Sequence, residues 1–102
     1  KEALKMLREA NDLKKNNGYI TDSLGWALFK TKNFSEAKKY LKIAIMLMPR
    51  DPVINDHFAD CLWMNDNKIQ ARYYWNNALE FDADDKLKKK IKRKILFGLE
   101  NI

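Results

Sequence analysis

Apolar residues recur at spacings of three and four positions along almost the whole chain, and no strand-length stretch alternates strictly between apolar and polar residues. This periodicity is typical of amphipathic helices. Polar, turn-forming groups interrupt it, and the interruptions predict helices over residues 1–15, 18–31, 34–48, 52–65, 68–82 and 84–100. The pattern therefore places the chain in the all-α fold class.

Three of the predicted helices carry recognisable N-terminal signals. Asp51 followed by Pro52 has the form of an N-cap and a first-turn proline, whose missing N–H would have no helical partner in any case. Asn33 and Asn67 each stand three residues before a Glu or Gln, the spacing of a capping box. We expect the side chains at all three positions to accept a hydrogen bond from the start of their helix.

The sequence repeats after 34 residues, and about two identities would be expected by chance at this shift. The residues that recur identically are Ile20, Asp22, Leu28, Asn33, Ala37, Tyr40, Ala44 and Asp51, which return as Ile54, Asp56, Leu62, Asn67, Ala71, Tyr74, Ala78 and Asp85. Residues 2–13 match residues 36–47 at the same shift, so the first helix corresponds to the second half of a repeat.

A helix-turn-helix unit of this length resembles the tetratricopeptide repeat. The matching residues are Leu24, Gly25, Ala37, Leu41, Ala44 and Pro49 in the first full repeat, and Phe58, Ala59, Ala71, Trp75 and Ala78 in the second. Small residues along one seam let paired helices approach closely, while the larger ones fill the space between pairs. The stretches DSLGWALF and DPVINDHFADCLW also look like the last repeats of bacterial tetratricopeptide proteins. The resemblance implies a right-handed solenoid.

The repeat divides the chain, as one domain over residues 1–102, into four parts. Residues 1–17 are the second half of a repeat, residues 18–51 and 52–85 are full repeats, and residues 86–102 form a capping helix. The period breaks in this last part, because continuing it would place lysines where the repeat packs apolar or small residues. We expect an apolar stripe of Leu87, Ile91, Ile95 and Leu99 to cover the end of the solenoid, with the lysines turned to water.

The charge is concentrated in this last helix. The net charge is +6, and residues 86–94 (KLKKKIKRK) carry seven positive charges and no acid, so the rest of the chain sums to −1. Such a cluster can neutralise phosphates, which makes binding of nucleic acid or an anionic membrane the alternative function. The excess of lysine over arginine suits an AT-rich bacterial genome, with the cytoplasm as the expected compartment, or the periplasm if the parent carries a signal peptide.

Candidate chemistry is sparse. The chain has one Cys and one His, Cys61 and His57, and it has no Gly-rich phosphate loop. We expect Cys61 to pack in a small-residue position and His57 to be an ordinary helix residue. The acids lie on two separate helices instead of one tight loop, so the sequence predicts no metal site, no cofactor and no catalytic residue. The longest apolar run, Ile43 to Met48, is far shorter than the about 18 residues of a membrane-spanning helix.

The family resemblance implies that the first helix of each repeat lines a concave face. The inward positions map to Tyr19, Asp22, Trp26, Phe29, Lys30, Val53, Asp56, Asp60, Trp63 and Met64. Their large side chains either fill the core or form exposed anchors for a partner, and we favour the second interpretation because the packed seams carry small residues. The acids favour a protein or peptide partner with apolar and basic residues, and would repel a terminal carboxylate.

The sequence therefore predicts a non-catalytic protein-interaction scaffold that binds a peptide or helix on its concave face. Self-association is a further expectation, because the basic and apolar composition of the last helix would complement the acidic face. Within one chain that helix should pack against the helix before it, so reaching the groove would require another molecule.

Overall fold

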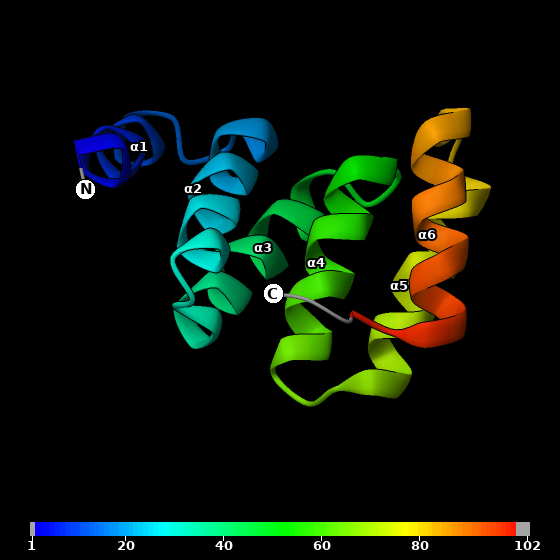
Figure 1. Cartoon of the computed structure of the whole chain (residues 1–102). Coiled ribbons are helices and arrows are strands. Elements are labelled where there is room, and N and C mark those ends of the chain that lie inside the picture. The colour runs from blue at the N-terminus through cyan, green and yellow to red at the C-terminus, as the bar shows by residue number, and fades with distance from the viewer. Residues whose placement is uncertain (1, 100–102) are drawn as a thin grey trace.

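The computed structural model describes residues 2–99 and contains six helices over that range, shown in Figure 1. They are α1 (Glu2–Leu13), α2 (Gly18–Lys30), α3 (Phe34–Leu47), α4 (Pro52–Met64), α5 (Lys68–Glu80) and α6 (Asp85–Phe97). All six predicted helices are confirmed, with boundaries shifted by three residues or fewer. None of the helices within residues 2–99 is long and apolar enough to cross a membrane.

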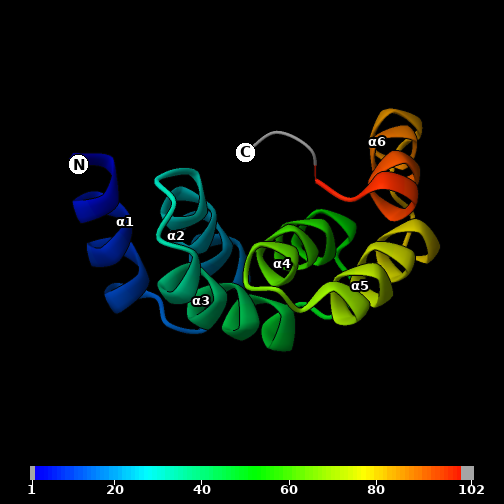
Figure 2. The ribbon, with the colours of Figure 1, turned by 60° about the horizontal axis from the view of Figure 1, so that its bottom comes forward.

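Consecutive helices pack against each other from α1 to α6, and the most extensive contacts join α2 to α3 and α4 to α5. Figure 2 shows the resulting layers: α2, α4 and α6 lie toward one side, and α3 and α5 lie on the other. We call the side formed by α2, α4 and α6 the inner face. After α6, the described chain continues through Gly98, which lies against Trp63 of α4.

The core follows the repeat. The small residues at the seams, Ala37, Ala44, Ala59, Ala71 and Ala78, are all completely buried. A Cβ added at Gly25 would lie 2.7 Å from Cγ of Leu41, so only glycine allows the observed approach of α2 and α3. Leu41 and Trp75, one repeat apart, are also fully buried. Ile91 is the buried residue of the stripe with which α6 closes the solenoid.

The caps divide into two groups. Oδ1 of Asp51 accepts from the Ile54 amide at 3.0 Å, as expected. The prediction for Asn33 and Asn67 is wrong, because neither side chain bonds the start of its helix. Nδ2 of Asn33 donates to Oγ1 of Thr31, and Oδ1 of Asn67 accepts from Nζ of Lys38. Their ψ angles of 66° and 64°, against 121° at Asp51, turn these side chains away from the free amides.

Candidate functional site

The inner face holds a cavity of ≈ 600 Å³ that lies between α2 and α6. Its lining comes from α2, the turn after α2, α4, α6 and the segment after α6: Trp26, Phe29, Lys30, Lys32, Asp60, Lys90, Lys94 and Leu99. We call this space the inner cavity. It combines apolar and aromatic surface with charged side chains, so it can hold both parts of an amphipathic ligand.

Trp26 lies at the centre of an aromatic stack in the inner cavity. Its ring lies parallel to that of Phe29, with centroids 4.7 Å apart, and parallel to the imidazole of His57 at 3.9 Å. Nζ of Lys30 lies 5.7 Å from the centroid of the Trp26 ring. Trp26 is half-buried and Phe29 is buried, so the stack joins the core to the cavity and holds the Trp26 ring in a fixed orientation.

His57 is more than an ordinary helix residue, and that expectation is wrong. Its Nδ1 lies 3.0 and 3.1 Å from the two carboxylate oxygens of Asp22, across the space between α4 and α2. Asp22 is buried, and this contact gives its carboxylate a hydrogen-bond partner inside the chain. The imidazole therefore links the two helices and supports Trp26 from one side.

Lys94 reaches from α6 to two buried carboxylates of α4. Its Nζ lies 3.0 Å from Oδ1 of Asp56, and 3.1 Å from both carboxylate oxygens of Asp60. The indole N–H of Trp75 donates to Oδ1 of Asp60 at 2.9 Å. Only 20% of the Lys94 side chain is exposed. The expectation that the lysines of this helix all turn to water is therefore wrong for Lys94.

This contact also corrects the premise for self-association. We expected that α6 could reach the acidic groove only in another molecule, but Lys94 meets Asp56 and Asp60 within its own chain. Asp56 and Asp60, which we expected to attract the cations of a partner, already pair with the ammonium group of Lys94. Self-association itself stays a prediction.

Burial shifts the pKa of Asp60, and its carboxylate partners shift the pKa of Lys94. Desolvation, followed by repulsion from Asp56, raises the pKa of Asp60 to about 6, against the attraction of Lys94. Desolvation alone would lower the pKa of Lys94, but the two carboxylates outweigh it and raise that pKa above its ordinary value. The ammonium group stays charged near neutral pH, because its carboxylate partners replace the water that it loses.

A second contact holds the end of α6 against α4 and α5. Gly98 lies directly over the ring of Trp63, where any Cβ would collide with the indole. Its φ of 72° and ψ of −170° belong to a backbone region that is essentially restricted to glycine. Nε of Arg72 donates to the carbonyl oxygen of Ile95 at 3.0 Å, and its guanidinium lies 5.0 Å from the Trp63 ring centroid. Trp63 is thus covered by the chain itself.

The ten predicted site residues have different surroundings. Trp26, Phe29, Lys30 and Asp60 line the inner cavity. Asp22 and Asp56 do not line it and pair with His57 and Lys94, while Trp63 lies against Gly98. Tyr19 and Val53 are 58% and 45% exposed and do not line it. Met64 lines a different depression.

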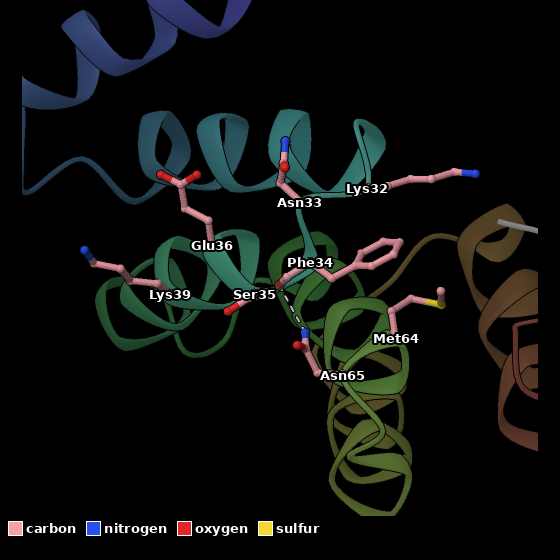
Figure 3. Close-up of a pocket in the computed structure, with 8 residues that line it drawn as sticks. All are labelled: Lys32, Asn33, Phe34, Ser35, Glu36, Lys39, Met64 and Asn65. Atoms are coloured by element: carbon pink, nitrogen blue, oxygen red, sulfur yellow. Dashed lines mark hydrogen bonds between the residues drawn. The ribbon is translucent and has the colours of Figure 1, made fainter.

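That depression, of ≈ 820 Å³, lies beside the turn between α2 and α3 (Figure 3). Its lining is mostly polar and includes Lys32, Asn33, Glu36 and Met64. Nδ2 of Asn65 donates to the carbonyl oxygen of Phe34 at 3.1 Å, so the end of α4 is tied to the start of α3 (Figure 3). Its polar groups do not converge on one point, and we assign it no chemistry.

Sequence reasoning missed Lys32, Lys90, Lys94 and Leu99 as parts of the site. One signal for Lys94 was available, because it comes three positions after Ile91 and so lies at the edge of the apolar stripe. A lysine at such an edge has its aliphatic stem half-covered and its amine free to reach a neighbouring helix. Nothing in the sequence showed that the neighbour would be α4.

The described residues that line the inner cavity include no His, Cys, Ser or Thr. Cys61 is completely buried, and desolvation raises the pKa of its thiol to about 12, so the thiolate form is suppressed. Within the residues that the structure describes, no group of three or more His, Cys, Asp or Glu side chains is arranged to hold a metal ion.

Comparisons with known proteins bear on the fold. Models of known protein families give no match, and neither do curated protein sequences. Among solved structures, the first TPR domain of Spaghetti (RPAP3), bound to the HSP90 peptide SRMEEVD, is similar to this chain with a TM-score of 0.79. The identity is 15%, over 90% of this chain and 74% of that one. The similarity, together with the repeat of 34 residues and the stacked helix pairs, shows that this chain has the tetratricopeptide repeat fold.

Proposed function

We propose that this chain is a non-catalytic protein-interaction module that binds a peptide or helix of a partner protein in the inner cavity. The observation that carries the proposal is the half-buried Trp26, stacked with Phe29 and His57 in a cavity of ≈ 600 Å³. Preorganised aromatic side chains in partly enclosed sites are the usual energetic centres of protein interfaces, since they lose little conformational entropy on binding.

The solved structure with the same fold supports this proposal, because it contains a bound peptide, SRMEEVD. The shared fold alone does not give the two proteins the same ligand. What supports binding here is the chain's own cavity, whose apolar part is the Trp26 and Phe29 rings and whose rim carries charged side chains.

The proposal can be tested by selecting binders from a displayed library of random peptides on the immobilised wild-type chain. Selected peptides should lose most of their affinity for Trp26→Ala and keep it for Tyr73→Ala. Tyr73 is a matched control, because it is an exposed aromatic residue of α5 that lines a separate depression on the other side of the fold. Far-UV circular dichroism would verify that both variants keep their helices.

A second measurement avoids dependence on the variant's folding. The indole N–H resonance of Trp26 in the wild-type protein should shift when a selected peptide is added, and the shift should saturate. Failure to select peptides above an empty support, or peptides that bind both variants as tightly as wild type, would refute the proposal. Salt-dependent retention on heparin, lost when residues 86–94 are neutralised, would support the nucleic-acid or membrane alternative instead.

A further inference from the structure

The charges around the inner cavity differ in whether they already have partners. Nζ of Lys94, which has three N–H groups, lies within 3.1 Å of three carboxylate oxygens of Asp56 and Asp60. Asp60 also accepts from the indole N–H of Trp75, and it is 4% exposed. Asp56 and Asp60 are thus almost fully buried and hydrogen-bonded inside the protein, and of the two only Asp60 reaches the cavity lining.

The third acid of the inner face is also hydrogen-bonded within the chain. Asp22 is buried, and both its oxygens lie within 3.1 Å of Nδ1 of His57. His57 itself lies under the ring of Trp26. A partner that contacts the outer surface of that ring would meet the indole and not the carboxylate behind it.

Three further lysines line the inner cavity besides Lys94. Lys30, Lys32 and Lys90 are exposed, and they form no ion pair with any carboxylate of the described residues. Lys30 and Lys32 come from the end of α2 and the turn after it, and Lys90 comes from α6. The cavity therefore has cations on two sides, with Trp26, Phe29 and Leu99 between them.

We propose that the inner cavity selects an acidic, apolar segment: an apolar side chain against Trp26, and Asp or Glu carboxylates at Lys30, Lys32 and Lys90. This inference rests on the proposed function and specifies its partner. It reverses the charge that the sequence predicted, because the acids of α2 and α4 are buried and hydrogen-bonded within the chain, whereas these three lysines are exposed. A partner with lysines would meet like charges at the rim. This repulsion makes the cavity discriminate against basic segments.

The test compares two double variants of equal net charge. Lys30→Glu/Lys90→Glu reverses the rim, whereas Lys42→Glu/Lys92→Glu changes two exposed lysines that do not line the inner cavity. Peptides selected on the wild-type chain should be enriched in Asp and Glu beside apolar residues. Their dissociation constants should increase about tenfold or more for the first variant, and less than about threefold for the second, at physiological salt.

The outcomes separate this inference from the proposed function. Basic or uncharged selected peptides that still require Trp26 would overturn the acidic partner and leave the interaction module standing. Equal weakening by both double variants would also overturn it, since the effect would then come from net charge and not from the cavity rim. If no peptide binds through Trp26, the proposed function fails and this inference fails with it.

Discussion

The two full repeats place equivalent residues in different environments. Trp26 and Phe29 of α2 correspond, one repeat later, to Asp60 and Trp63 of α4. In the first repeat these positions line a cavity that is open to a ligand. In the second repeat the carboxylate of Asp60 also lines this cavity but is paired with Lys94, and the indole of Trp63 lies against Gly98.

The difference arises from the helix that lies next to each repeat on the inner face. α2 has α4 as its next neighbour there, and Asp22 meets only the imidazole of His57 from that helix. α4 has α6, which supplies Lys94 and a glycine turn that continues across Trp63. The same position in a repeat can thus serve a ligand or the fold, depending on the length and charge of the side chain that the neighbouring helix presents.

The largest expected effect is on the free energy of unfolding, and it differs between the cores of the two repeats. Trp75→Ala should lower the free energy of unfolding by about 4 kcal/mol, and Leu41→Ala by about 3 kcal/mol, because both side chains are fully buried but the indole is larger. Trp75 also donates a hydrogen bond to Asp60, which Leu41 cannot do. Urea unfolding followed by circular dichroism measures both values. A greater loss in Leu41→Ala would contradict this comparison.

The glycine contact over Trp63 predicts a smaller effect. Gly98→Ala should cost about 2 kcal/mol, because alanine at φ 72° is strained and its Cβ would meet the indole. Gly18→Ala is the control, since a Cβ there meets the flexible side chain of Met48, and it should cost less than about 1 kcal/mol. Equal thermal stability of Gly98→Ala and wild type would show that the turn does not rest on Trp63.

The pKa of about 6 at Asp60 predicts a pH dependence. Because burial raises this pKa above its value in the unfolded chain, the folded state binds the proton more tightly. The contribution of Asp60 to stability is therefore largest below about pH 4 and is lost as the pH rises through about 6.

The variant Asp60→Asn removes this titration while Asp22, Asp56, His57 and Lys94 remain. Denaturant unfolding of both proteins from pH 8 to pH 5 should show the stability of the wild type improving relative to Asp60→Asn as the pH falls. A difference that stays constant across this range would contradict the raised pKa.

The fold could be predicted from the sequence because its determinants are local and repeated. The spacing of apolar residues gave all six helices, and the small residues at Gly25, Ala37 and Ala71 marked the seams that the structure buries. The caps at Asn33 and Asn67 failed because a capping box depends on backbone angles. The residues before them, Lys32 and Asp66, have positive φ and rotate the chain out of the capping geometry.

The candidate site could be predicted only in part. The family resemblance implied which side of α2 and α4 faces inward, and four of the ten residues that it named, Trp26, Phe29, Lys30 and Asp60, line one cavity. It could not show that Lys94, 34 residues after Asp60, ends beside it. That contact depends on the path of α6 over α4, and so do the accessibility of the acids and the charge of the rim.

The smallest expected effect concerns the turns of the two repeats. Lys32 and Asp66 have φ of 66° and 64°, which glycine adopts without the strain of a Cβ. Lys32→Gly and Asp66→Gly should each raise the free energy of unfolding by about 0.5 kcal/mol. Thr31→Gly, at φ −93°, is the control and should lower it. Loss of stability in all three variants would contradict the assignment of strain.

The most direct test of the account is a double-mutant cycle between Lys94→Met and Asp60→Asn, measured by urea unfolding at pH 7.5. Nζ of Lys94 lies 3.1 Å from both carboxylate oxygens of Asp60. The account predicts that the summed losses in the two single variants exceed the loss in the double variant, with a coupling energy of about 1–3 kcal/mol. Losses that add to within about 0.3 kcal/mol would mean that Lys94 and Asp60 do not stabilise each other across the inner face.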